Sequence, residues 1–115
     1  MAGSQVIRNA GQTVRLDVTS TAHAAVLIDD NTNDQINYTA FLNFGTTPIA
    51  IKFGQTSSMG APTFPADGTN GDYVIPPLMS YPIILATPTT PYYIRAICSG
   101  SDTGTLYVTP AADQS

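Results

Sequence analysis

The segment Ile36–Gly54, INYTAFLNFGTTPIAIKFG, decides the fold class of this chain. Apolar residues occupy every second position from 36 to 44 and again from 49 to 53, which is the period of a β-strand. A short polar stretch ending in Pro48 separates the two runs, and proline and glycine are typical turn residues. We therefore expect two strands joined as a hairpin.

The two Phe-Gly pairs of this segment predict where its strands are anchored and where they end. Phe44 and Phe53 are expected to be core residues, and Gly45 and Gly54 to be the breakers that stop the strands. Lys52 alternates with the apolar side of the second strand, so its side chain is expected to be in solvent. The segment holds no reactive group, which indicates scaffold and not chemistry.

Composition extends the β assignment to the whole chain of 115 residues. Charged residues make up 10%, glutamate is absent, lysine occurs once, and there are nine glycines and nine prolines. Glutamate and lysine are good helix formers, whereas the abundant Thr, Val, Ile and Tyr favour strands. The length is typical of one domain with a self-sufficient core. An all-β domain is therefore predicted.

Alternating or continuous apolar runs bounded by turn residues occur about eight times along the chain. They cover residues 13–19, 24–28, 36–44, 49–53, 73–75, 81–86, 92–98 and 105–109. A Gly- and Pro-rich loop spans residues 55–72. This pattern predicts a two-layer antiparallel β-sandwich of short strands, with jelly-roll-like or other Greek-key wiring. We expect an N-terminal arm (1–12), a sandwich domain (13–110) and a polar C-terminal tail (111–115).

Charge limits the kinds of partner. The four basic residues Arg8, Arg15, Lys52 and Arg95 are scattered, and the net charge is −4. Without a basic stripe, direct nucleic-acid binding is not expected, and the negative charge disfavours anionic membranes. No apolar run approaches the roughly 20 residues of a membrane span, and the N-terminal residues lack a signal-peptide core. We expect synthesis in the cytoplasm.

Catalysis is not expected. His23 is the single histidine and Cys98 the single cysteine, so no disulfide can form within the chain. No nucleophile motif accompanies His23, and Cys98 lies in an apolar run that predicts a buried, inert thiol. The protein is therefore predicted not to be an enzyme and to need no cofactor.

One polar loop resembles the start of a calcium site. Asp29–Asn33 reads D-x-N-x-N, but Asp34 stands where such a loop has glycine, and Ala40 stands where it has an acidic ligand. Local turn hydrogen bonds of Asp and Asn explain the same residues, so no metal is predicted. The alternative is a calcium site completed by a second loop that carries Asp67 and Asp72.

Five residues are candidates for contact with a protein partner. Val6 and Ile7 form an apolar pair beside Arg8, apart from the core pattern, and suit an arm that docks on a neighbouring subunit. The alternative is that they form an additional edge strand. Six tyrosines with no tryptophan are the other source of anchors, and tyrosine is a rigid amphipathic contact residue. Among them, Tyr81 and Tyr92 are the candidates.

The order of its segments makes the chain resemble small tailed-phage virion proteins that decorate or cement the icosahedral head. The segments are TVRLDVTSTAHAAVLI (13–28), FLNFGTTPIAIKFG (41–54), YVIPPLMSYPIIL (73–85) and TTPYYIRAICSGSDTGTLYVTPA (89–111). The resemblance covers residues 13–110 and consists of strand and turn patterns without a chemical motif.

The resemblance implies a β-sandwich or jelly roll on the outer surface of the capsid that cements neighbouring major capsid subunits. It also implies a homo-oligomer, either a dimer or a trimer, and no catalytic residues. The major capsid protein and further copies of this chain are then the expected partners. The alternative function is a carbohydrate- or receptor-binding module of a phage tail or spike, which would use loop aspartates and tyrosines.

Overall fold

A computed structural model describes residues 7–9, 11–21, 23–29, 38–86 and 92–113. In this part of the chain all regular structure is β, in nine strands. Their bounds are Ile7–Asn9 (β1), Val14–Val18 (β2), Val26–Asp29 (β3), Tyr38–Leu42 (β4), Ile49–Gly54 (β5), Tyr73–Ile75 (β6), Ile83–Ala86 (β7), Tyr92–Ile97 (β8) and Gly104–Asp113 (β9). The predicted all-β class is confirmed.

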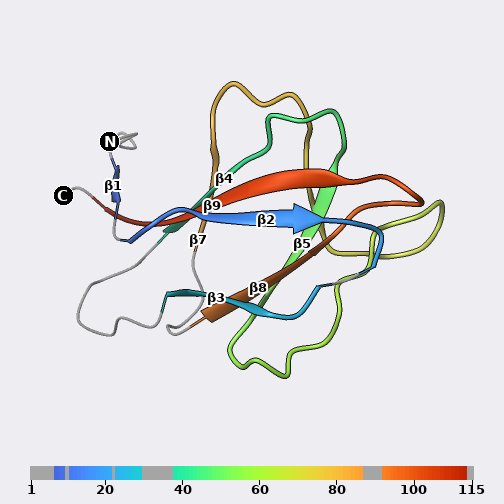
Figure 1. Ribbon diagram of the computed structural model, residues 1–115, viewed down its shortest axis with the longest axis horizontal. Helices are drawn as coiled ribbons and strands as arrows, with labels where there is room; N and C mark the ends of the chain where they lie inside the picture. The colour runs from blue at the N-terminus through green and yellow to red at the C-terminus, as the bar shows by residue number, and fades with distance from the viewer. Residues whose placement is uncertain (1–6, 10, 22, 30–37, 87–91, 114–115) are drawn as a thin grey trace.

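The strands form two antiparallel sheets that pack as a sandwich, also as predicted (Figure 1). The first sheet has the order β1-β9-β4-β7, with β2 also paired to β9. β2 pairs with residues 104–108 of β9 and β1 with residues 111–113, so the two share one strand position at that edge. The second sheet has the order β3-β8-β5-β6. Each sheet therefore has four strand positions.

The pairing of the strands is nested along the sequence. β2 pairs with β9, β3 with β8, β4 with β7 and β5 with β6. Between β2 and β9, every connection except that from β5 to β6 passes from one sheet to the other. Each layer is thus assembled from segments that lie far apart in the chain.

The predicted hairpin between the two halves of the opening segment is wrong. β4 belongs to the first sheet and β5 to the second, so residues 43–48 cross between the layers. The physical reason lies in long-range pairing, because β4 is taken up by β9 on one side and β7 on the other. A strand with both edges occupied has no place for β5.

The core lies between the two sheets and consists of aliphatic and aromatic side chains. Its polar members are paired, since the Tyr92 hydroxyl and the Thr39 hydroxyl lie 2.8 Å apart in the buried interior. The Phe53 ring packs near Phe41, with centroids 5.9 Å apart, and near Tyr92, at 6.0 Å. The hydrophobic core residues are Leu16, Val18, Ile28, Phe41, Ile49, Ile51, Ile75, Tyr92, Ile94, Ala96, Cys98, Leu106 and Val108. The prediction that Phe53 anchors the core is confirmed.

Phe44 is not a core residue, which corrects the prediction for it. Its side chain is 62% exposed, and Thr39 and Phe41 form the inward face of β4. The side of β4 that carries Tyr38, Ala40 and Leu42 is the outer face of the sandwich. The sequence pattern favoured the opposite orientation, because the outward positions of this strand are more apolar than the inward ones.

Two expected boundaries also shift. β9 continues through Asp113, three residues into the segment predicted as a polar tail, and residues 7–9 of the predicted arm form β1 against it. β5 ends at Gly54, as predicted. A Cβ at this position would stand 2.6 Å from Met59 atoms, so glycine is needed for close approach of the following loop. Lys52 faces outward as predicted, although its side chain is half-buried and not fully solvated.

Candidate functional site

Two loops meet at one end of the first sheet and form its most distinctive surface. They are residues 43–48, between β4 and β5, and residues 76–82, between β6 and β7 (Figure 1, top). The Leu78 amide donates to the Gly45 carbonyl at 2.8 Å, and the Met79 amide donates to the Asn43 carbonyl at 3.0 Å. These backbone bonds hold the two loops against each other.

The Asn43 side chain organises the first loop from within. It is fully buried, its Nδ2 donates to the Thr47 carbonyl at 2.8 Å, and its Oδ1 accepts the Gly45 amide at 3.1 Å. A buried amide with both ends paired fixes a turn, because breaking it would leave polar groups unpaired. The loop that crosses between the sheets is therefore rigid at the point where it meets residues 78 and 79.

The backbone of Leu78 is strained. Its φ is 58°, in the left-handed region that a residue with a Cβ adopts at a cost of about 1–2 kcal/mol. The side chain is 70% exposed, so packing of the leucine does not compensate that cost. Strain of this kind that is held by surrounding hydrogen bonds is frequent at functional surfaces.

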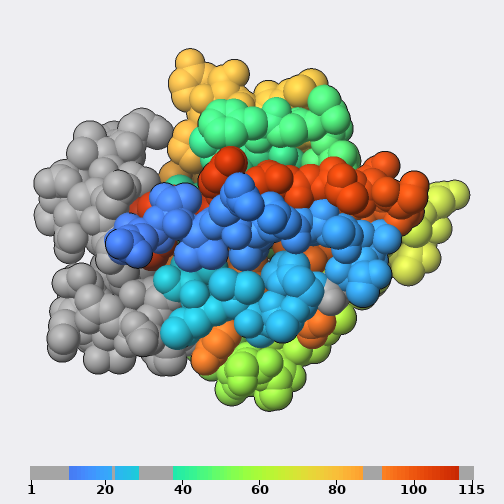
Figure 2. All heavy atoms as spheres, in the orientation of Figure 1, coloured from blue at the N-terminus to red at the C-terminus, as the bar shows by residue number. Residues whose placement is uncertain are grey.

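Phe44, Leu78 and Tyr81 together form what we call the loop patch. They are 62%, 70% and 82% exposed, and Tyr81 is the most exposed large hydrophobic residue described. The Phe44 ring stands edge-on to Tyr107 of β9, with centroids 5.9 Å apart. In Figure 2 the two loops appear as neighbouring green and gold protrusions at the same end of the molecule. Large exposed side chains on a rigid base are typical of interaction sites.

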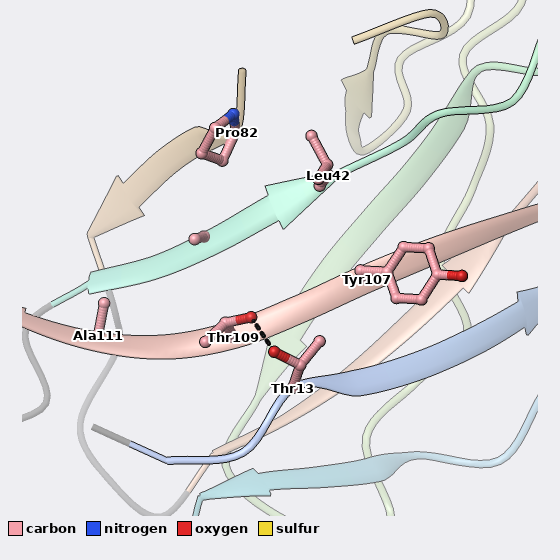
Figure 3. A pocket seen from close by; sticks show the side chains of 7 residues that line it. Thr13, Leu42, Pro82, Tyr107, Thr109 and Ala111 are labelled. Carbon is pink, nitrogen blue, oxygen red and sulfur yellow. Dashed lines mark hydrogen bonds between the residues drawn. The ribbon is translucent and has the colours of Figure 1, made fainter. Parts of the chain in front are cut away.

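The outer face of the first sheet continues the loop patch as an open hollow of about 350 Å³. Leu42 of β4, Pro82 and Tyr107 lie around it (Figure 3), and Ala40 also lines it. At its far side the hydroxyls of Thr13 and Thr109 lie 2.7 Å apart. The outer face of a sandwich is usually polar, so this apolar lining is unusual.

The two stretches of chain that supply the loop patch also lack charge. No charged residue occurs between Asp34 and Lys52 or between Asp72 and Arg95. The fold places these two stretches side by side, because β4 pairs with β7 and the two loops are hydrogen-bonded. A surface that is both apolar and uncharged results, which suits contact with protein and not with phosphate.

No family model, curated protein or solved structure matches this chain. Its fold and surfaces therefore carry the functional argument.

The predicted contact residues differ in where they lie. Tyr81 belongs to the loop patch. Tyr92 is fully buried and bonded to Thr39, so its selection as a contact residue is corrected: its side chain fills the core. Ile7 and Arg8 belong to β1, which is the edge-strand alternative, and Val6 lies outside the described residues.

Sequence reasoning missed Phe44 and Leu78. Phe44 was assigned to the core because it continues the apolar alternation of its strand, and Leu78 was passed over inside a proline-rich turn. The two uncharged stretches were the available signal, since each patch residue falls within one of them. Their adjacency could not be seen without the pairing of β4 with β7.

His23 has a structural environment. Its Nε2 accepts the backbone amide of Ala96 at 3.1 Å, and its Nδ1 donates to the Ala24 carbonyl at 2.6 Å. These two bonds require the neutral ring with the proton on Nδ1. The ring therefore connects the segment before β3 to β8, and neither nitrogen is available to activate a nucleophile in this arrangement.

Cys98 is buried, as predicted. Its thiol lies 3.7 Å from the Val18 carbonyl and connects the end of β8 to β2. Burial raises the pKa of the Cys98 thiol, and the nearby negative charge of Asp102 raises this pKa further. The thiolate is the reactive form, so this environment lowers the reactivity of Cys98.

Among the described residues, no group of three or more His, Cys, Asp or Glu side chains could hold a metal ion. Asp72 has a local role, since its Oδ2 accepts the Thr63 amide at 2.7 Å in the long loop. Residues 30–37, which hold most of the predicted polar loop, lie outside the described residues. The described part of the chain also has no helix long and apolar enough to cross a membrane.

Proposed function

We propose that this protein is a structural component of a tailed-phage head that binds the outer capsid surface and cements neighbouring major capsid subunits. The loop patch is the observation that carries this proposal. Its three large side chains are exposed at a defined position, on loops held by backbone bonds and a buried amide. A cementing protein needs such preformed contacts, because ordering a loop on binding would weaken it.

The wiring of the sandwich supports the same proposal. We infer a jelly roll from the nested pairing, in which the first strand position pairs with the last and the second with the second last. Jelly rolls are double-sheet folds frequent among viral capsid proteins. The segment order that resembles head decoration proteins points in the same direction, with the virion surface as the location and the major capsid protein as partner.

The test is saturable binding of the purified chain to phage heads that lack a decoration protein. We expect the wild-type chain to bind up to a fixed number of copies per head. Tyr81→Ser is expected to weaken binding by about tenfold or more, as loss of a central aromatic anchor does at other interfaces. Because Tyr81 is 82% exposed, this change should leave the fold intact.

Tyr73→Ser is the matched control. Tyr73 is 53% exposed and lies on β6 of the second sheet, so the chemical change is identical at another surface. We expect its binding to heads to equal that of wild type. Absence of saturable binding, or equal losses for the two variants, would contradict the proposal.

A carbohydrate- or receptor-binding module is the second candidate, and the exposed rings of Tyr81 and Tyr73 favour it. An exposed aromatic ring is a platform on which a sugar can stack. A sugar site also needs several polar side chains that converge on the ligand, whereas the loop patch and the stretches around it carry no charge. Binding on a glycan array that is lost in Tyr81→Ser would favour this module over the capsid protein.

A further inference from the structure

The four sheet edges of the sandwich differ in how they are protected from pairing with another chain. The edge formed by β1 and β2 is divided between two short strands and carries Arg15 and Asp17, which form an exposed ion pair. β3 has a register shift between Leu27 and Asp29, and β6 has only three residues. Charge, irregularity and shortness all discourage association at an edge.

β7, with four residues, carries neither charge nor irregularity. Its sequence is Ile83-Ile84-Leu85-Ala86, and it pairs with β4 through four consecutive residues without a register shift. Pro82 stands just before the strand, so every residue of β7 keeps its amide donor. An apolar, regular edge strand with its donors and acceptors in place is a template for another strand.

The side chains and charges around β7 indicate what could pair there. β7 and its neighbour β4 lie in the two stretches without charged residues, whereas the eight aspartates that give the chain its net charge of −4 all lie outside them. Two copies of this acidic chain can therefore pair at β7 with no aspartate on β7 or on its neighbour β4 in either copy. At most other surfaces, like charges would oppose association.

We propose that β7 pairs antiparallel with β7 of a second copy of this chain, about a two-fold axis, and joins the two first sheets into one continuous sheet. An antiparallel strand is self-complementary under such an axis. Side chains directly opposite one another share a face of the sheet, so the register must pair residues of like orientation.

A two-fold axis that passes through the pair formed by Ile84 and its copy meets this requirement, since residues on the same side of the sheet then lie opposite each other. Ile84 then faces its own copy on the outer face of the sheet, where it is already 38% exposed. Ile83 faces Leu85 of the partner on the core side. Each contact across the axis is apolar.

The first experiment is light scattering on the isolated chain over a range of concentrations. We expect the mass of two chains for wild type. Ile84→Lys places two positive charges opposite each other at the axis, and we expect it to weaken the dimer by about tenfold or more. Thr105→Lys is the control, because it adds the same charge to the outer face of the same sheet, on β9 away from this edge.

The second experiment tests the register. Directly opposite residues of antiparallel strands have Cα atoms about 4.5–5.5 Å apart, which is within the span of a disulfide. Ile84→Cys is therefore expected to form a covalent dimer on oxidation with copper phenanthroline, and Ser57→Cys, in an exposed loop, is not. The buried Cys98 is retained in both variants and serves as an internal control.

The inference deepens the proposed function by adding a second copy of this chain as a partner, but it is tested without phage heads. A monomeric wild type, or a dimer that Ile84→Lys leaves unchanged, would overturn the β7 pairing. Neither result would affect binding of Tyr81 to a capsid. Conversely, a β7 dimer that fails to bind heads would leave this inference standing and remove the proposed function.

Discussion

The outer faces of the two sheets differ in whether other segments of the chain cover them. On the second sheet, Arg95 donates from Nε to the His23 carbonyl at 2.8 Å and from Nη1 to the Met59 carbonyl at 3.0 Å. One guanidinium thereby fastens the segment before β3 and the loop after β5 to the same strand, and Met59 packs directly over Gly54. This face is covered by the chain itself.

The first sheet has no such cover over β4 and β7 among the described residues. Its adjoining loops are as well organised as those of the second sheet, but their hydrogen bonds hold Phe44, Leu78 and Tyr81 outward. A well-ordered loop in this protein therefore either covers a sheet or leaves it exposed. The chain uses similar hydrogen bonds to cover one outer face and to leave the other exposed, which supports the proposal that partners bind on the first sheet.

The largest effect on stability is expected from substitution of Asn43, whose side-chain amide orders the loop beside the exposed face. Asn43→Ala leaves the Thr47 carbonyl and the Gly45 amide without their partner and empties a fully buried side-chain position, which we expect to lower the free energy of unfolding by about 3 kcal/mol. Denaturant unfolding measures this change. Thr46→Ala, in the same turn and exposed, should cost no more than about 0.5 kcal/mol. Equal costs for the two variants would show that the amide does not organise the loop.

Substitution of Arg95, which holds two segments over the outer face of the second sheet, is expected to have the next largest effect on stability. Arg95→Ala loses two charge-assisted hydrogen bonds and should lower the free energy of unfolding by about 2 kcal/mol. It should also make residues 55–61 more susceptible to limited proteolysis. Arg95→Lys keeps the charge but lacks the fork that reaches both carbonyls, so it should recover only part of the loss. Unchanged proteolysis in both variants would contradict the assigned role.

Substitutions of Leu78 can separate the effect of its backbone strain on stability from the effect of its side chain on binding. Leu78→Gly removes the penalty of a Cβ at positive φ but adds glycine entropy, so we expect a net stabilisation of at most about 1 kcal/mol. Leu78→Ala keeps the strain and should not stabilise the protein. Both variants should bind phage heads more weakly than wild type. A stability gain for alanine as large as that for glycine would contradict backbone strain.

The smallest effect concerns two like charges on the outer face of the second sheet. Lys52 and Arg95 lie directly opposite each other in the pairing of β5 with β8. Lys52→Thr is therefore expected to stabilise the fold by about 0.5 kcal/mol at low salt, and less at high salt. In an Arg95→Ala background the gain should disappear. A gain that is independent of both salt and Arg95 would indicate a cause other than repulsion.

The strands of this fold could be predicted from the sequence because alternation is a local property. The inward side of β5, Ile49, Ile51 and Phe53, was clear since Lys52 marks its other side. In β4 the alternation is misleading, because its outward side, with Tyr38, Ala40 and Leu42, is the more apolar one. Its orientation, and the crossing of residues 43–48 to the other sheet, depend on pairing with β7 and β9, which lie far away in the sequence.

The candidate site was predictable only in part for the same reason. Tyr81 was selected because tyrosine is a common contact residue, and its side chain is exposed. Tyr92 was misassigned because its hydroxyl partner, Thr39, comes from the opposite sheet and nothing in the local sequence indicates it. Phe44 and Leu78 lie together only because two loops more than thirty residues apart are hydrogen-bonded.

The nested pairing of the strands has a consequence for folding during synthesis on the ribosome. β9, near the end of the chain, is the strand that joins β1, β2 and β4 into one layer. Until Asp113 has been synthesised and has left the exit tunnel, the earlier strands of this layer lack their central neighbour and present unpaired edges to solvent. Such delayed, long-range closure makes folding slow and leaves nascent chains prone to aggregation. Deletion of β9 should therefore abolish the first sheet as a whole, and the yield of folded protein should depend on how quickly synthesis is completed.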